Sequence, residues 1–254
     1  MKRIMFDEVS RNNLYSDLLV LFFMGIILLL GYIIGLIYGN PYFGIIFSLI
    51  VGILYILFVF SAGDKMVLSL AGAKPVTKKE YPHLYHAIEG LSIAAGIPTP
   101  KAYVIEDSAL NAFATGLKPE NASVVVTTGL LNKMNRQELE GVIAHELAHI
   151  KNNDIRYMLF ITVLIGVTML LSDFILRSFL WGKKGKGRQG NAQIIIIAIG
   201  LLLALLSPLI VQLIRLAISR KKEFAADANA AIITRYPPGL ASALRKIKDD
   251  PDPK

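Results

Sequence analysis

Two histidines and a glutamate near the middle of the chain have the spacing of a metal-dependent hydrolase. His145 and His149 are four residues apart, so in a helix they lie one turn apart on the same face and both imidazoles can reach one metal ion. Glu146 lies about 100° around the helix from His145, which places it beside that metal and not on it. In this HExxH arrangement the glutamate accepts a proton from the attacking water at a zinc site. The pattern therefore predicts zinc-dependent hydrolysis.

A catalytic zinc takes three protein ligands and leaves one position open, so a third ligand must come from elsewhere. Glu223 is a good candidate, because two apolar runs separate it from His149 and a pair of membrane crossings would bring the flanking helices together. Asp227 follows one helical turn later and has the offset of a carboxylate that orients a ligating histidine. In the alternative interpretation, Glu223 belongs to the solvated face of a basic helix.

Two other interpretations of the histidines are open. His145 and His149 could be packed in a core, but Glu146 and Glu223 would then be buried without a partner. His83 and His86 are three residues apart and could form a second metal site. Because no cluster of carboxylates or cysteines lies near them, ordinary surface histidines are the simpler interpretation.

The composition indicates an integral membrane protein. The chain has 254 residues, is 54% hydrophobic and contains no cysteine, and its mean hydropathy is +0.53. Soluble domains are about 45–50% apolar. The net charge of +8 comes from lysines and arginines that flank long uncharged runs, which favours anionic lipid headgroups as the partner and not nucleic acid. The absence of cysteine excludes disulfides and is compatible with a catalytic part in the cytosol.

Two uncharged runs near the N-terminus each have the length of a membrane-spanning helix. Leu18–Tyr38 and Tyr42–Ala62 are separated by Gly39-Asn40-Pro41, a turn signal. We expect a hairpin whose basic, open end faces the cytoplasm. The first run is too long for a signal-peptide core and lacks a cleavage site after it, so it should stay in the mature protein.

Two further runs predict a second hairpin. Ile194–Ile214 has the composition of a membrane helix, whereas Met158–Leu180 spans the membrane only if it includes Asp173 and Arg177. If both runs cross, the basic loop between them faces outward, against the positive-inside rule. Partial embedding of Met158–Leu180 is the alternative.

Between the hairpins, the return of charge and of proline and glycine indicates a compact lobe of mixed helix and strand. Asn135 and Glu138 have the spacing of a capping box at the start of the helix with the two histidines. Basic residues 215–227 should be helical as the chain leaves the membrane. Five more elements are expected: a helix over Pro82–Ala95, strands over Lys101–Ile105, Ala112–Thr115 and Ala122–Thr128 with a hairpin between the last two, and an amphipathic helix over Gly239–Ile247.

Four stretches resemble one protein family. They are Ala144 to His149 (AHELAH), Ser219 to Asp227 (SRKKEFAAD), Asn111 to Gly116 (NAFATG) and Val126 to Leu131 (VTTGLL). Together with the N-terminal hairpin they are similar to the HtpX family of membrane zinc metalloproteases, relatives of the prenyl-protein proteases. The family has a further helical segment beyond the one that corresponds to Gly239–Ile247, so this chain, which ends at Lys254, is shorter than the family pattern.

The resemblance implies a function and a site. His145, His149 and Glu223 would bind one Zn²⁺ per chain, and Glu146 would be the general base. Asn111, Ala112, Phe113 and Ala114 would border the substrate cleft, where a peptide could add as a further strand. The enzyme would be a multi-pass protein of the cytoplasmic membrane with its active site facing the cytoplasm, and would cleave damaged or misassembled membrane proteins without a small-molecule cofactor or nucleic acid.

These observations predict an α+β membrane protein with a zincin-like cytoplasmic lobe, a small antiparallel sheet and about four transmembrane helices in two hairpins. The expected parts are the first hairpin (1–62), the first part of the lobe (63–157), the second hairpin (158–214) and the second part of the lobe (215–254). The alternative function is a catalytically silent membrane scaffold or adaptor that retains a structural zinc.

Overall fold

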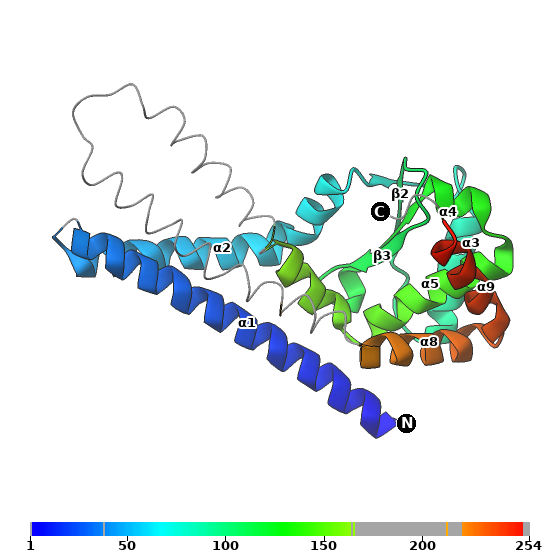
Figure 1. Cartoon of the computed structure of the whole chain (residues 1–254), viewed down its shortest axis with the longest axis horizontal. Coiled ribbons are helices and arrows are strands. Elements are labelled where there is room, and N and C mark those ends of the chain that lie inside the picture. The colour runs from blue at the N-terminus through cyan, green and yellow to red at the C-terminus, as the bar shows by residue number, and fades with distance from the viewer. Residues whose placement is uncertain (1, 38, 164, 166–211, 213–219, 251–254) are drawn as a thin grey trace. The chain divides into compact units, whose positions relative to one another are not determined.

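The computed structural model describes residues 2–37, 39–163, 165, 212 and 220–250 (Figure 1). The chain forms two compact units. One, here called the sheet unit, comprises Met1–Leu14, Gly63–Leu159 and Ala217–Lys254. The other, here called the apolar unit, comprises Tyr15–Ala62 and Phe160–Leu216. The sheet unit contains every residue predicted to take part in catalysis.

The apolar unit contains the predicted N-terminal hairpin. Helix α1 (Lys2–Ile37) and helix α2 (Pro41–Leu70) are joined at Gly39, whose φ of +79° is accessible to glycine. The side-chain oxygen of Asn40 accepts a hydrogen bond from the backbone N–H of Phe43 and caps α2. Both helices are long and apolar enough to cross a membrane. Leu21 and Tyr42 are 68% and 78% exposed, which is unfavourable for such side chains in water and favourable in lipid.

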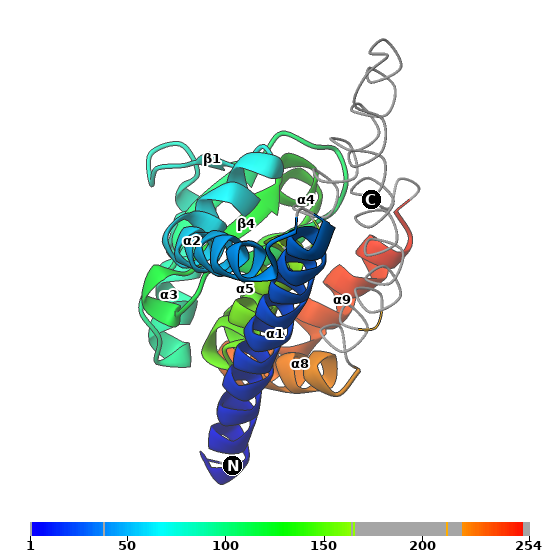
Figure 2. The ribbon, with the colours of Figure 1, turned by 90° about the vertical axis from the view of Figure 1, so that its left-hand side faces the viewer.

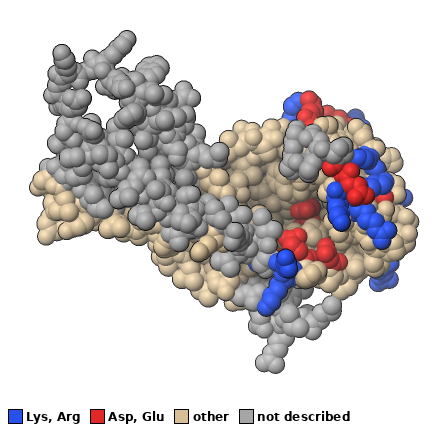
Figure 3. Space-filling model, in the orientation of Figure 1, with Lys and Arg blue, Asp and Glu red and all other residues tan. Residues whose placement is uncertain are grey.

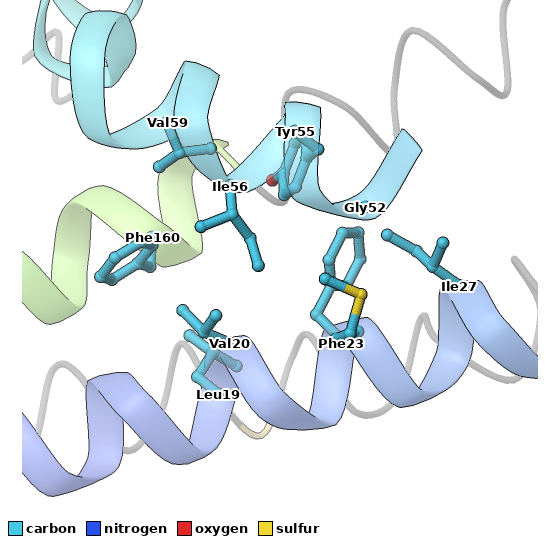
Figure 4. Close-up of a pocket in the computed structure, with 10 residues that line it drawn as sticks. Leu19, Val20, Phe23, Ile27, Gly52, Tyr55, Ile56, Val59 and Phe160 are labelled. Atoms are coloured by element: carbon cyan, nitrogen blue, oxygen red, sulfur yellow. The ribbon is translucent and has the colours of Figure 1, made fainter. Parts of the chain in front are cut away.

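The two long helices approach each other closely. A Cβ atom on Gly44 would meet the backbone oxygen of Gly31, so only glycine fits there. Such small residues let membrane helices pack backbone to backbone. Further along, Phe23 and Tyr55 lie 5.2 Å apart between ring centroids. They line a narrow apolar pocket that Phe160 also borders (Figure 4).

The helices extend beyond the predicted membrane segments. Helix α1 begins at Lys2 and not near Leu18, and α2 continues past Asp64 and Lys65 to Leu70. Charged residues end an uncharged run, but lysine and glutamate are good helix formers and aspartate is tolerated, so the helix itself continues. Of the second predicted hairpin, residues 158–163 are helical, and nearly all the rest lies outside the described residues.

The sheet unit is built on a four-stranded sheet with the order β1-β2-β4-β3. The strands are β1 (Lys74–Pro75), β2 (Lys101–Ile105), β3 (Ala112–Thr115) and β4 (Ser123–Thr127). Strand β4 is central and all five of its residues are buried. The predicted strands and the hairpin between β3 and β4 are confirmed.

The sheet is mixed, so the prediction of an antiparallel sheet was wrong. Strand β3 is antiparallel to β4, and β1 to β2, but β2 and β4 are parallel. Consecutive strands do reverse direction along the chain. However, β4 and not β3 lies beside β2, because β4, with three consecutive valines at its centre, is best buried in the middle of the sheet. This leaves β3 at the edge.

The helix with the two histidines forms the centre of the sheet unit. Helix α5 (Arg136–Lys151) begins with the predicted capping box, in which Asn135 and Glu138 each accept a hydrogen bond from the backbone of the other. Ile143, Leu147 and Ile150 are fully buried in the core. The helix packs against β3 and against three other helices: α3 (Pro82–Ala95), α8 (Arg220–Thr234) and α9 (Pro237–Lys248) (Figures 1 and 2). Short elements α4 (Thr128–Lys133) and η1 (Pro119–Asn121) complete the unit.

A tight turn follows α5. Asn152 and Asn153 form it, and Asn153 takes a left-handed conformation with φ of +56°, which asparagine tolerates better than most residues. A second helix, residues 154–163, starts immediately afterwards at Asp154. The turn therefore directs Asp154 back toward the end of α5.

Candidate metal centre

The structure brings the two predicted histidine ligands together. The ring centroids of His145 and His149 are 4.9 Å apart, and their Nε2 atoms are separated by 3.2 Å. This follows from their spacing of one helical turn on α5. Both side chains are largely buried, with 15% and 17% of their surface exposed. The two nitrogens therefore share one small site at the surface of the helix.

Helix α8 supplies a carboxylate to the same site. Glu223 Oε2 lies 3.5 Å from His145 Nε2, and Glu223 Oε1 lies 3.9 Å from His149 Nε2. One donor atom from each of these three residues lies within 4.8 Å of the other two. Acidic side chains gather around a hollow on this face of the sheet unit (Figure 3). His149 and Glu223, which are 74 positions apart in sequence (223 − 149), thus come together at one point.

A carboxylate lies behind each imidazole. Asp227 Oδ1 is 2.9 Å from His145 Nδ1, and Asp154 Oδ2 is 3.1 Å from His149 Nδ1. A carboxylate accepts hydrogen bonds, so each Nδ1 carries the proton and each Nε2 of the neutral ring carries a lone pair. Two lone pairs 3.2 Å apart repel unless a cation lies between them. Two imidazoles and one carboxylate are the donor set that zinc takes in catalytic sites, so these residues fit that ion.

The carboxylates also affect the pKa of His145. Burial lowers this pKa, but a hydrogen bond that the protonated ring donates to Glu223 and the charges of Glu146, Asp227 and Glu223 outweigh burial and raise it above its usual range. Conversely, the pKa of Glu223 is lowered, mainly by the hydrogen bond with His145. Both shifts indicate that the site stabilises positive charge between its donor atoms.

Glu146 lies next to this site in a different environment. Its half-buried carboxylate accepts a hydrogen bond from the backbone N–H of Ala114 in β3. Burial raises the pKa of Glu146, while His149 and His145 oppose that rise without cancelling it. A carboxylate with a raised pKa is a stronger base than an exposed one, which suits proton transfer near neutral pH.

The four predicted substrate residues lie along the edge of the sheet nearest to Glu146. The backbone N–H of Thr127 donates a hydrogen bond to the backbone oxygen of Asn111. The same register continues along the strand, where Ala112 to Thr115 pair with Val126 to Ser123. In an antiparallel ladder the backbone groups of alternate residues point away from the partner strand. In β3, the residues whose backbone groups point away from β4 are Ala112 and Ala114. The N–H of Ala114 contacts Glu146, and the Asn111 side chain is exposed.

Sequence reasoning missed Asp154, which follows His149 by five residues. Asp154 is 4% exposed, and its Oδ1 contacts Lys222 Nζ at 2.9 Å. Burial alone would raise its pKa, but hydrogen bonds with His149 and Lys222 and the charge of Lys222 lower it. The signal available in the sequence was the position of Asp154, which lies close after the HExxH motif and directly after two asparagines suited to a turn.

Tyr236, whose hydroxyl group could donate to an oxyanion, lies away from the metal centre. It precedes α9 and lines a groove with Asn135 and Glu138 at the start of α5. His145 follows Asn135 by ten residues (145 − 135), or about 15 Å along a helix.

His83 and His86 lie on α3, and His86 Nδ1 is 3.8 Å from Glu89 at the surface. No further metal cluster is found among the described residues.

This fold and this site together define a metal-dependent peptidase, and comparisons with known proteins agree. The model of peptidase family M48 matches residues 78–248. An HtpX protease homologue of Dictyoglomus turgidum is 46% identical over 204 residues, covering 80% of this chain and 66% of its own length. One from Dictyoglomus thermophilum is 41% identical over 254 residues, covering 100% of this chain and 83% of its own. The chain therefore belongs to peptidase family M48, among the HtpX proteases.

A solved structure has the same fold. The crystal structure of S. mikatae Ste24p aligns with 94% of this chain and 59% of its own, with a TM-score of 0.52 at 24% sequence identity. The family membership makes this chain a membrane metalloprotease, and the predicted family is confirmed.

Proposed function

We propose that the chain is a zinc-dependent endopeptidase of the cytoplasmic membrane that hydrolyses damaged or misassembled membrane proteins, with its active site facing the cytoplasm. The observation that carries the proposal is the convergence of His145, His149 and Glu223 on one point, with Glu146 beside it.

His145, His149 and Glu223 would hold the zinc, and Asp227 and Asp154 would orient the two rings. When bound, zinc polarises the scissile carbonyl and acidifies the attacking water. Glu146 accepts the proton of that water and later returns a proton to the leaving amine. The N–H of Ala114 holds the Glu146 carboxylate toward the site.

The free edge of β3 would position the substrate. An extended peptide can pair with the outward backbone groups of Ala112 and with the carbonyl of Ala114. Asn111, at the start of the strand, and the Phe113 side chain would border the bound peptide. This arrangement would bring a peptide bond next to Glu146 and orient it by backbone contacts, which suits substrates of varied sequence.

The division of the chain supports a membrane location. We propose that 1–62 and 158–214 are membrane hairpins, and that 63–157 and 215–254 together form the catalytic lobe. The compact units assign Gly63–Leu159 and Ala217–Lys254 to one body, which supports this division, and they add Met1–Leu14 to that body. The lengths and apolar composition of α1 and α2 support the first hairpin.

A silent scaffold with a structural zinc is the alternative. Structural zinc sites usually have four protein ligands, whereas the described residues provide three here. The open position and the adjacent Glu146 favour catalysis.

The test is proteolysis by the full chain in detergent, measured with fluorescent casein. We expect Glu146→Gln to lower kcat by about 10²- to 10⁴-fold while the protein still binds one zinc, because Glu146 is not a ligand. Glu223→Ala should instead lose the metal. Glu140→Gln is the matched control, because this glutamate lies on the same helix but pairs with Arg136 at the surface. Zinc binding without turnover in the wild-type chain would favour the scaffold.

A further inference from the structure

We propose that Asn12, in the first helix, is a positioning residue of the metal centre: it holds Asp154 in the orientation in which Asp154 fixes His149. The inference rests on the proposed zinc site. It extends that site to a segment outside residues 78–248, the part of the chain that the family model matches.

Asn12 contacts the turn after α5 through two hydrogen bonds. Its Nδ2 donates to Asp154 Oδ1 at 2.8 Å and to the backbone oxygen of Asn152 at 3.0 Å. Asn12 is 2% exposed and Asp154 is 4% exposed. A buried polar contact between such distant parts of the chain has a specific geometry, because neither group can exchange its partner for water.

The contacts of Asp154 are divided between its two oxygens. Oδ2 accepts from His149 Nδ1, while Oδ1 accepts from Asn12 and lies 2.9 Å from Lys222 Nζ. Because a carboxylate is planar, two donors fixed at Oδ1 determine where Oδ2 points. Lys222 alone would not achieve this, since an ammonium group on a flexible stem can follow the carboxylate as it rotates.

The orientation of Asp154 in turn affects His149. Its hydrogen bond keeps the proton on Nδ1 and the lone pair of Nε2 toward His145 and Glu223. Without Asn12, the carboxylate can rotate and the ring loses its fixed tautomer and orientation. Partners of this kind typically contribute about 10- to 100-fold to metal affinity. Asn12 acts on His149 indirectly, through its hydrogen bond with Asp154.

Asn13 provides a matched control. Its Oδ1 accepts from Asn153 and from Arg156, each at 3.4 Å, so it contacts the same turn from the neighbouring position of α1. No contact is found between Asn13 and Asp154. Asn12→Ala and Asn13→Ala therefore remove comparable side chains from the same surface, and only the first removes a donor to Asp154.

The experiment measures zinc affinity of the full chain in detergent by competition with a chromophoric chelator, and the visible absorption spectrum of the Co²⁺-loaded protein. Asn12→Ala should weaken zinc binding by about tenfold or more and alter the Co²⁺ spectrum, which reports the ligand field at His149. Asn13→Ala should leave both unchanged. Equal zinc affinities and spectra for Asn12→Ala and wild type would overturn the inference.

Two further variants separate positioning from folding. Asn12→Ser keeps a polar group but cannot reach Asp154, and it replaces Asn12→Ala if that variant does not fold. The exchange Asn12→Asp with Asp154→Asn reverses donor and acceptor across the 2.8 Å contact. The double variant should bind zinc more tightly than either single variant, and an affinity no better than that of Asp154→Asn alone would contradict the proposal.

The outcomes also distinguish this inference from the proposed function. If the wild-type chain binds no zinc, the proposed function fails and the inference fails with it. If the wild type binds zinc and the Asn12 variants bind it equally well, only the inference fails.

Discussion

Each histidine of the metal centre has its own carboxylate, and only one of the two could be predicted. Asp227 follows Glu223 by one turn of a helix, a spacing visible in the sequence. Asp154 reaches His149 only because Asn153 adopts a left-handed turn, which helical periodicity does not indicate. Sequence periodicity therefore identifies residues on one helix face, but not residues that a turn returns to it.

Glu138 is a second buried carboxylate with several partners. Only 3% of its side chain is exposed, and it contacts Lys246 Nζ at 2.6 Å and the hydroxyl of Ser242 at 2.7 Å. Burial alone would raise the pKa of Glu138. The hydrogen bonds from Lys246, Ser242 and the backbone N–H of Asn135, with the charge of Lys246, lower it below the usual range. The carboxylate is thus more acidic in the folded than in the unfolded chain.

This lowered pKa predicts how stability depends on pH. The contribution of Glu138 should be complete above its unfolded pKa of about 4.3 and should be lost as the pH falls through its lower folded pKa. Near neutral pH, Glu138→Gln should therefore lower the unfolding free energy by about 1–3 kcal/mol.

Thermal unfolding of the chain in detergent at a series of pH values measures this effect. The difference between wild type and Glu138→Gln should shrink only in the acid range. Glu120→Gln is the control, because Glu120 is exposed in η1. A difference that grows as the pH falls would contradict the prediction.

Among the elements, those with local signals could be predicted and those that depend on distant partners could not. Proline at the start of α3 and Gly96 after it marked that helix, and the capping box marked α5. The hairpin of β3 and β4 was predicted from its turn. The parallel pairing of β2 and β4 was not, because strand order depends on which strand is buried most deeply, a property of the whole sheet.

The contact between α5 and α9 depends on a glycine. A Cβ on Gly141 would lie 2.6 Å from the backbone nitrogen of Leu240. Gly141→Ala should therefore separate the two helices and lower stability by about 1–3 kcal/mol.

The control is Gly90→Ala in α3, where a Cβ would meet no atom within 4 Å. Alanine stabilises an exposed helical position by about 0.5–1 kcal/mol relative to glycine. Denaturant unfolding in detergent should thus give shifts of opposite sign for the two substitutions. Equal shifts would mean that Gly141 has no packing role.

At the scale of the whole molecule, the proposed membrane anchor predicts a preference among substrates. Tethering both enzyme and substrate to one bilayer raises their effective concentration to about the millimolar range. In vesicles, an unfolded peptide with a membrane anchor should be cleaved faster than the same peptide in solution.

Initial rates with labelled peptides measure this preference, with Glu146→Gln vesicles as the background. Dissolving the vesicles in excess detergent should remove the advantage of the anchored peptide while leaving cleavage of the free peptide intact. Equal rates for the two peptides in intact vesicles would contradict the proposed substrate class.

The position of Glu223 and Asp227 on a single turn of α8 has one further consequence. The first contributes a donor atom to the centre and the second supports His145 from behind. If that turn unwinds, the ion loses a ligand and one of its imidazoles loses its anchor in the same event. Unwinding of that turn and loss of the ion should accordingly occur together on heating, and activity should disappear in the same transition.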